Sequence, residues 1–159
     1  MNPTEVDSIK FKHSRFTTRL LTDRLYTPAH FWLKEHTPNV WHVGFTKFAQ
    51  RMLGEIVEID FEVGTGHPIK QGQIVGWAEA FKAVTDIYAI SDGIFSGGNP
   101  EIIKDPGIID ADANHQGWLY AIEGQPDSTA MNAQGYADLL TETIDRLRGT
   151  MYDTEGPNT

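Results

Sequence analysis

Short apolar segments separated by glycine and other turn residues fill much of the chain between residues 40 and 122, and they limit the fold more than any other feature. Examples are VWHVGF (40–45), QIVGWAEA (73–80), VTDIYAI (84–90) and GWLYAI (117–122). Many short strands spaced by turns are typical of small β-sandwiches and barrels. We therefore predict a mainly β fold. A chain of 159 residues without cysteine is long enough to bury its core without disulfide bonds.

Two segments favour helices instead. TKFAQRML (46–53) follows a strand, with Thr46 as a candidate N-cap and Gly54 at the position where the helix should end. Near the C-terminus, apolar residues recur at helical spacing and should form one stripe that packs on the sandwich: Tyr136, Leu139, Leu140, Ile144 and Leu147. We expect this second helix to end at Gly149.

These patterns divide the chain into an N-terminal extension (1–25), a single domain (26–148) and a flexible tail (149–159). The first dozen residues show no clear periodicity, so we expect an extended lead that either straps onto the domain or stays disordered. The segment from 15 to 25 mixes strand and helix signals, and its conformation stays open. In IVEIDF (56–61), Val57, Ile59 and Phe61 alternate with acids, as in a half-buried strand.

Charge and hydropathy exclude several classes of partner. The 13 Lys and Arg against 22 Asp and Glu give a net charge of -9, which would repel nucleic-acid phosphates. Residues 1–34 hold six of the cations and only three of the acids, so the lead is basic and the body acidic. No apolar stretch approaches the roughly 20 residues that span a bilayer, and we find no secretory signal. We expect a cytoplasmic protein that binds neither nucleic acid nor membrane.

The sequence offers little for catalysis but has one notable lysine. Six histidines form no HExxH pattern, no cysteine can bind zinc, and there is neither a phosphate-binding loop nor a GxSxG motif. Lys82 lies in EAFKAVTDIYA (79–89) between two strand candidates, where an exposed hairpin tip would suit a swinging cofactor arm. Most lysines in turns only add solubility. A carrier, whose chemistry resides on an attached group, fits these residues better than an enzyme.

Several motifs, taken in order, resemble the glycine cleavage system H protein family: YTPAHFW (26–32), VGFTKFAQRMLGEIV (43–57), EVGT (62–65), the lysine run and GWLYAI (117–122). This resemblance implies that residues 26–148 form a lipoyl-type barrel-sandwich hybrid with a short internal helix and a C-terminal helix. It also implies that lipoic acid is joined to Lys82 as N6-lipoyllysine. Biotin carriers typically flank this lysine with methionines, whereas Phe81 and Ala83 flank it here, which favours lipoate.

The resemblance also assigns roles to neighbouring residues. Glu79 matches an acid of the family and is a candidate for recognition by a lipoate-protein ligase or lipoyl transferase; the alternative is a solvated strand charge. Phe31 replaces a family acid, and Phe81 replaces a small aliphatic residue. Both are candidates for lining a groove in which the arm rests. Trp77 and Tyr88 are further candidates, with a place in the core as the alternative, and we expect His30 to be a structural, hydrogen-bonded histidine.

These departures bear on the cargo of the arm. The aminomethyl group of glycine cleavage is cationic and would be attracted by a carboxylate, which Phe31 does not provide. The chain, including its basic lead, is similar to the lipoate-binding branch of bacterial sulfur oxidation. That resemblance implies shuttling of sulfur-bound intermediates or reducing equivalents, with a heterodisulfide-reductase-like complex and dihydrolipoamide dehydrogenase as partners. The alternatives are a glycine cleavage H protein and an unlipoylated scaffold or interaction module.

Overall fold

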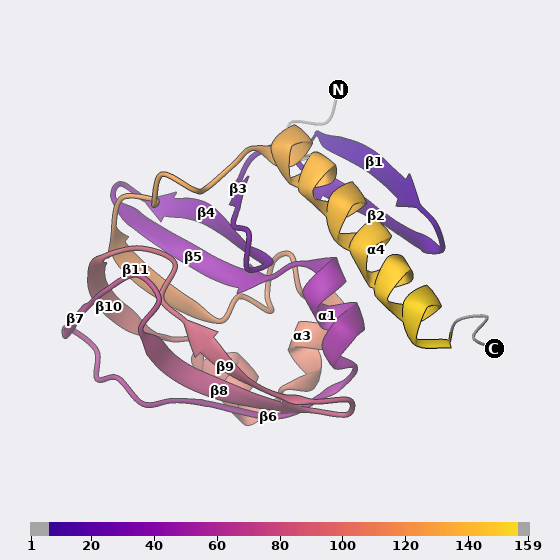
Figure 1. Cartoon of the computed structure of the whole chain (residues 1–159). Helices are drawn as coiled ribbons and strands as arrows, with labels where there is room; N and C mark the ends of the chain where they lie inside the picture. Colours follow the sequence, from indigo (N-terminus) through magenta and orange to yellow (C-terminus); the bar gives the residue numbers. More distant parts are fainter. Residues whose placement is uncertain (1–6, 156–159) are drawn as a thin grey trace.

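The computed structural model describes residues 7–155, and two antiparallel sheets form the centre of the molecule (Figure 1). The six-stranded sheet has the order β3 (Leu25–Tyr26), β4 (Phe31–Thr37), β5 (Val40–Phe45), β11 (Tyr120–Gly124), β10 (Gly93–Gly98) and β7 (Pro68–Ile69). The three-stranded sheet has the order β6 (Ile56–Phe61), β8 (Ile74–Ala80) and β9 (Val84–Tyr88). The main core lies between these sheets, with Leu33 and Val43 from one and Val75 and Ile87 from the other fully buried. The predicted mainly β class is confirmed.

Helix α1 (Lys47–Leu53) has the ends that the sequence predicts. The Thr46 hydroxyl oxygen accepts a hydrogen bond from the Ala49 amide, and the Gly54 amide donates to the Gln50 carbonyl. Both predictions, the N-cap and the glycine end, are confirmed. Two further short helices, α2 (Pro100–Lys104) and α3 (Gly107–Asp112), lie against β6 and were not expected from the sequence.

Strand β6 corrects one detail of the predicted alternation. The register of β6 with β8 shifts between Ile56 and Glu58, so Val57 occupies a bulge and is 58% exposed. Because a bulge inserts one extra residue, the buried positions on this strand become Ile56 and Ile59. The strand itself is where the sequence placed it.

The N-terminal extension contains a β-hairpin, β1 (Ser8–His13) and β2 (Phe16–Leu21), which forms its own two-stranded sheet. Alternation of side chains buries Phe11, Phe16 and Leu20 on the inner face. The sequence alone did not settle the conformation of this segment, because a hairpin this short gains little stability until another element covers its apolar face. Residues 1–6 lie outside the described residues, and the division of the chain at residue 25 stays a prediction.

Helix α4 (Ala133–Glu155) provides that cover (Figure 1). Tyr136, Leu140 and Ile144 are buried in a second apolar cluster together with the inner face of the hairpin. The helix therefore packs on the hairpin as well as on the sandwich, which corrects the expected packing. Leu147, expected in the stripe, is 40% exposed. The helix also continues past Gly149, where we expected it to end; residues 156–159 lie outside the described residues.

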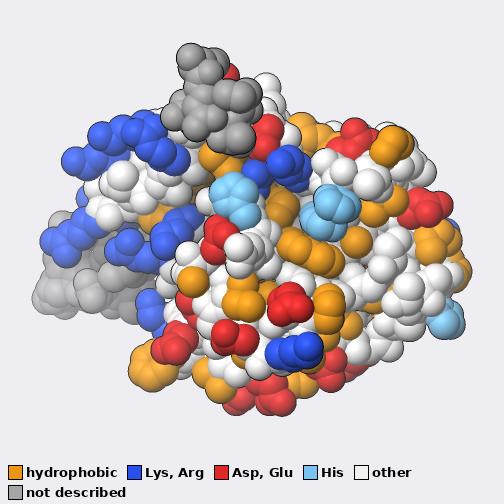
Figure 2. All heavy atoms as spheres, turned by 180° about the vertical axis from the view of Figure 1, so that it is seen from behind, with side chains coloured by type: hydrophobic (Ala, Val, Ile, Leu, Met, Phe, Trp, Pro, Cys, Tyr) orange, Lys and Arg blue, Asp and Glu red, His pale blue; other side chains and the backbone are white. Residues whose placement is uncertain are grey.

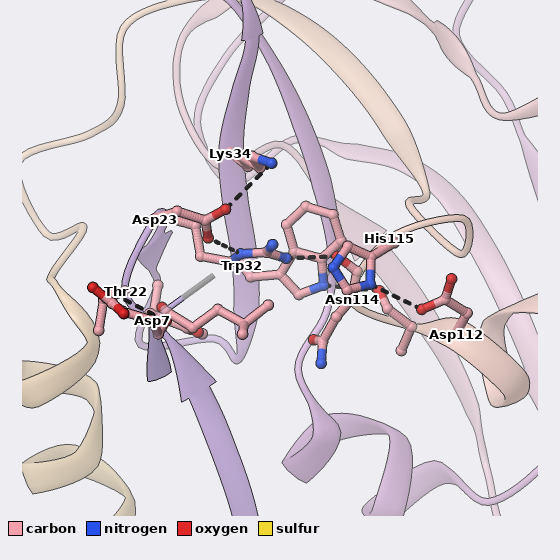
Figure 3. Close-up of polar contacts among 12 residues, drawn as sticks. Asp7, Thr22, Asp23, Trp32, Lys34, Asp112, Asn114 and His115 are labelled. Atoms are coloured by element: carbon pink, nitrogen blue, oxygen red, sulfur yellow. Dashed lines mark hydrogen bonds and ion pairs between the residues drawn. The ribbon is translucent and has the colours of Figure 1, made fainter. Parts of the chain in front are cut away.

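A polar network fixes the base of the hairpin to the domain (Figure 3). Arg24 donates from Nε to Asp23 at 2.8 Å and from a terminal nitrogen to the Asn114 carbonyl at 2.6 Å, and its guanidinium lies 4.7 Å from the Trp32 ring centre. Lys34 Nζ is 3.2 Å from the second Asp23 oxygen. Burial raises the pKa of Asp23, but the bonds and charges of Arg24 and Lys34 outweigh it and hold that pKa below its usual range. The hairpin is thus held at its base as well as along its length.

Candidate functional site

Lys82 lies at the tip of the hairpin formed by β8 and β9. Residues 81–83 connect the strands, and the Ala80 amide donates to the Ala83 carbonyl at 2.8 Å to close the turn. The Lys82 side chain is exposed. The tip position expected from the sequence is therefore present, whereas attachment of a cofactor at Lys82 stays a prediction.

The tip is docked on the C-terminal end of α1 through its backbone. The Phe81 amide donates to the Glu55 carbonyl and the Lys82 amide to the Leu53 carbonyl, each at 2.8 Å. The last carbonyls of a helix have no partner within it, so the bond from Lys82 to Leu53 satisfies a group that would otherwise need water. Lys82 Nζ donates to the Arg51 carbonyl at 3.2 Å. The backbone of Lys82 is fixed, while its ammonium group is held by a single exposed contact.

Gly54 allows the hairpin tip to approach the end of α1 closely. Its φ of 80° and ψ of -168° belong to a region that is essentially restricted to glycine. A Cβ atom at this position would lie 3.2 Å from Lys82 Cγ and 3.3 Å from Phe81 Cβ. The same residue that ends α1 therefore leaves room for the tip.

The surface around the tip is apolar and acidic. Phe81 is 81% exposed and Val84 is 73% exposed. Glu79 is exposed on the sheet, with Glu58 of β6 on one side and Val84 of β9 on the other. Glu79 is thus available to a partner protein, as its candidate role in ligase recognition requires, but that role stays a prediction.

A groove of about 200 Å³ runs between α1 and β9, which is the edge strand of its sheet. Its apolar lining includes Phe31, Phe45 and Phe48, and its other side includes Asp86 and Tyr88. Phe31 is only 4% exposed and its ring stacks on Phe45 at 5.8 Å. Phe31 and Tyr88 therefore line the same groove, and its use as a resting place for an arm stays a prediction.

Two of the aromatic candidates lie elsewhere. Phe81 and Trp77 do not line the groove: Phe81 projects into solvent at the tip, and Trp77 is half-buried in β8, in register with Asp60 and Asp86. Phe31 reaches this groove from β4, whereas Phe81 lies beyond the end of β8 and does not, so a groove role for Phe81 stays a prediction. Sequence reasoning also missed Asp86, the carboxylate of the groove, whose outward position in β9 follows from simple alternation.

His30 takes the structural role expected of it. Its Nδ1 lies 2.9 Å from the Tyr136 hydroxyl, which donates to Thr46 Oγ1 at 2.8 Å. Burial lowers the pKa of His30, which favours the neutral ring. This chain of contacts joins α4 to the N-terminus of α1, on the same side as the groove. Within residues 7–149, His, Asp and Glu side chains nowhere gather in threes to hold a metal ion.

Comparison with known proteins connects this geometry to one family. The family model described as Glycine cleavage H-protein matches residues 24–143. The glycine cleavage system H protein of Methylacidiphilum infernorum is 33% identical over 124 residues, which cover 76% of this chain and 95% of that protein. The H protein of Bordetella avium is 36% identical over 120 residues, covering 74% and 94%.

A solved structure agrees with the sequence relatives. The crystal structure of a glycine cleavage system H protein from Mycobacterium marinum matches with a TM-score of 0.65 and 28% identity, covering 74% of this chain and 95% of that one. The region matched by the family model, residues 24–143, contains the Lys82 hairpin, α1 and the groove. The hairpin β1–β2 lies before it.

Proposed function

Because the chain belongs to the glycine cleavage H-protein family, whose members carry lipoate covalently on a lysine, we propose that it is a lipoyl carrier with its arm on Lys82. One observation carries this proposal. Lys82 is exposed at a hairpin tip, and backbone bonds to the end of α1 fix its position. The family lysine must present a reactive amine to a ligase and then hold an arm in a reproducible place, and the geometry of Lys82 meets both needs.

The residues around Lys82 fit a lipoyl group. Amide formation would remove the ammonium charge and the weak contact with the Arg51 carbonyl. The apolar groove beside α1 would then shelter the hydrocarbon part of the arm, with Phe31 at its base. The bound group would supply dithiol chemistry, while the protein positions the arm and presents surfaces to a ligase and to partner enzymes. No catalytic base is required of the chain itself.

Glycine cleavage is the first candidate pathway, since the relatives bear the name of that system. The arm would then take up an aminomethyl group and pass it between partner enzymes, with dihydrolipoamide dehydrogenase reoxidising it. Asp86 lends support from the groove, because its carboxylate would attract a cationic cargo.

Sulfur oxidation is the second candidate, and the apolar base of the groove favours it. Phe31, which by the family resemblance replaces an acid, is buried, and burial lowers the pKa of His30 nearby. An uncharged or anionic sulfur cargo would suit this base better than an ammonium group. In this case the arm would serve cytoplasmic enzymes that include a heterodisulfide-reductase-like complex.

Intact mass of protein isolated from its own host tests attachment. We expect one lipoyl mass increment on the wild-type chain, its loss in Lys82→Arg, and its retention in the matched control Lys70→Arg, which alters another exposed lysine. An increment that persists in Lys82→Arg would disprove attachment at Lys82. An unmodified wild-type chain would favour the scaffold reading instead.

Exchange of labelled bicarbonate into glycine separates the two pathways. The lipoylated chain is incubated with the glycine decarboxylase of its host. Exchange at the rate of a known H protein supports the first candidate. Lack of exchange, together with turnover of the arm by the heterodisulfide-reductase-like complex, supports the second.

A further inference from the structure

The basic hairpin β1–β2 differs in charge from the rest of the molecule. Residues 8–21 contain Lys10, Lys12, Arg15 and Arg19 and no acid. The hairpin thus carries +4 in a chain of net charge -9, so the remaining residues sum to -13. Figure 2 shows Lys and Arg side chains gathered at the end of the molecule that holds the hairpin and α4, with Asp and Glu spread over the rest of that face.

The outer face of the hairpin is free to contact another molecule. Lys10, Lys12, Arg15 and Arg19 are all exposed, and Lys10 and Arg19 are direct neighbours across the two strands. Among the described residues, none of the four forms an ion pair with a carboxylate; the one hairpin group that does is His13, whose Nε2 lies 2.7 Å from Asp145 of α4. Four cations that form no ion pair among the described residues create a positive potential that a folding role does not require.

The hairpin also lies beside the groove proposed for the arm. The ring of Phe16, at the start of β2, packs edge-on against Phe48 with ring centres 5.5 Å apart. Phe48 in turn lines the groove. The contact of His13 with Asp145 and the network around Arg24 hold the hairpin in place. The hairpin that carries the four cations is therefore fixed in place relative to the groove.

We propose that this hairpin is a docking surface for an enzyme with an acidic patch beside the entrance that receives the arm. The inference rests on the proposed carrier function and adds a determinant of partner choice. Family similarity begins at residue 24, after the hairpin, so the hairpin adds recognition to the carrier region that the family shares. A discrete acidic patch on a protein fits better than nucleic acid, because the body of the chain, at -13, would be repelled by an extended polyanion.

Charge reversal with a matched control tests the proposal. Lys10→Glu/Lys12→Glu changes the outer face of β1, and Lys70→Glu/Lys104→Glu makes the same change in net charge at exposed positions away from the hairpin. Each lipoylated protein is assayed with the host enzyme that turns over the wild-type arm, either glycine decarboxylase or the heterodisulfide-reductase-like complex. In 50 mM salt, we expect the KM for the hairpin variant to rise about tenfold with kcat unchanged, and the control to stay within about twofold.

Salt dependence provides the second readout. The KM of the wild-type chain should rise with ionic strength, and that of the hairpin variant should respond much less, because screening acts on charges that the variant has lost. A hairpin variant within twofold of the wild type, or an equal effect in the control, would overturn the docking role. If the wild type but not the hairpin variant cosediments with phosphatidylglycerol vesicles, the partner of the hairpin is a membrane, and the proposed docking to an enzyme is overturned. A wild-type chain that lacks lipoate, or that neither enzyme turns over, would instead contradict the proposed carrier function. The docking proposal would then fail as well, because it rests on that function.

Discussion

Two hairpins of this protein present lysines to solvent, and they are held in different ways. The tip of β8–β9 is fixed by backbone bonds from residues 81 and 82 to the end of α1. The hairpin β1–β2 is held mainly by apolar side chains against α4. Backbone bonds define the position of one residue closely, as a single attachment site requires. Side-chain packing secures a whole face and leaves the opposite face free for recognition.

The largest effect should follow from removing a side chain on which β1–β2 depends. Phe16 is 7% exposed and packs on Phe48, so we expect Phe16→Ala to lower the free energy of unfolding by about 3 kcal/mol. The matched change at the other hairpin, Phe81→Ala, removes a ring that is 81% exposed and should cost less than about 0.5 kcal/mol. Urea unfolding gives both values. Equal costs for the two variants would contradict the contrast between the hairpins.

Hydrogen exchange would show where the Phe16→Ala variant loosens. We expect faster exchange for amides in β1 and β2, and little change in β8 and β9. Uniform loss of protection would mean instead that the two hairpins belong to one cooperative unit.

An intermediate effect should follow from disturbing the backbone contact at the tip. We expect Gly54→Ala to cost about 2 kcal/mol, since alanine would adopt a conformation reserved for glycine and its Cβ would press on the tip. It should also slow lipoylation by purified ligase, because Lys82 would be displaced. Gly72→Ala is the matched control: its φ is 84°, but no atom lies within 4 Å of an added Cβ. A Gly54 variant lipoylated at the wild-type rate would show that the tip needs no precise docking.

The smallest effect concerns β5, in the six-stranded sheet. Burial, with help from His36 and Lys34, lowers the pKa of His42 to about 4. The unfolded chain therefore takes up a proton near pH 6.5 that the folded chain does not, so this contribution to stability is complete above pH 6.5 and is lost as the pH falls toward 4. Between pH 7 and 5 we expect His42 to account for about 1 kcal/mol, after allowance for its partial exposure.

The His42→Phe variant isolates that contribution. The ring of His42 stacks on Trp118 at 3.9 Å, and phenylalanine keeps a flat ring there without a titrating group. Chemical unfolding at pH 7 and pH 5 should show a smaller acid-induced loss of unfolding free energy for this variant than for the wild type. In hydrogen exchange, the two hairpins should be affected to the same extent. An equal loss in both proteins would exclude His42 as a source of acid sensitivity.

The sequence predicted the strands of the two main sheets better than the N-terminal hairpin. Alternating and apolar runs, together with Thr46 and Gly54, located β5, α1, β6, β8 and β9 because these signals are local. The bulge at Val57 was missed, since it arises from the register with β8. The conformation of β1 and β2 stayed open because their apolar face is covered largely by α4, more than 100 residues away in the chain.

The sequence by itself determined that this chain is mainly β, that it lacks a thiol of its own, and that its one distinctive lysine lies in a turn between strands. It also fixed the charges, a basic lead and an acidic body, because these depend only on composition. Only the tertiary structure decided which groups meet. It separated Phe31 from Phe81, placed Asp86 at the groove, and brought the basic hairpin beside it. Such contacts depend on packing between distant segments, and local patterns in a sequence contain no record of that packing.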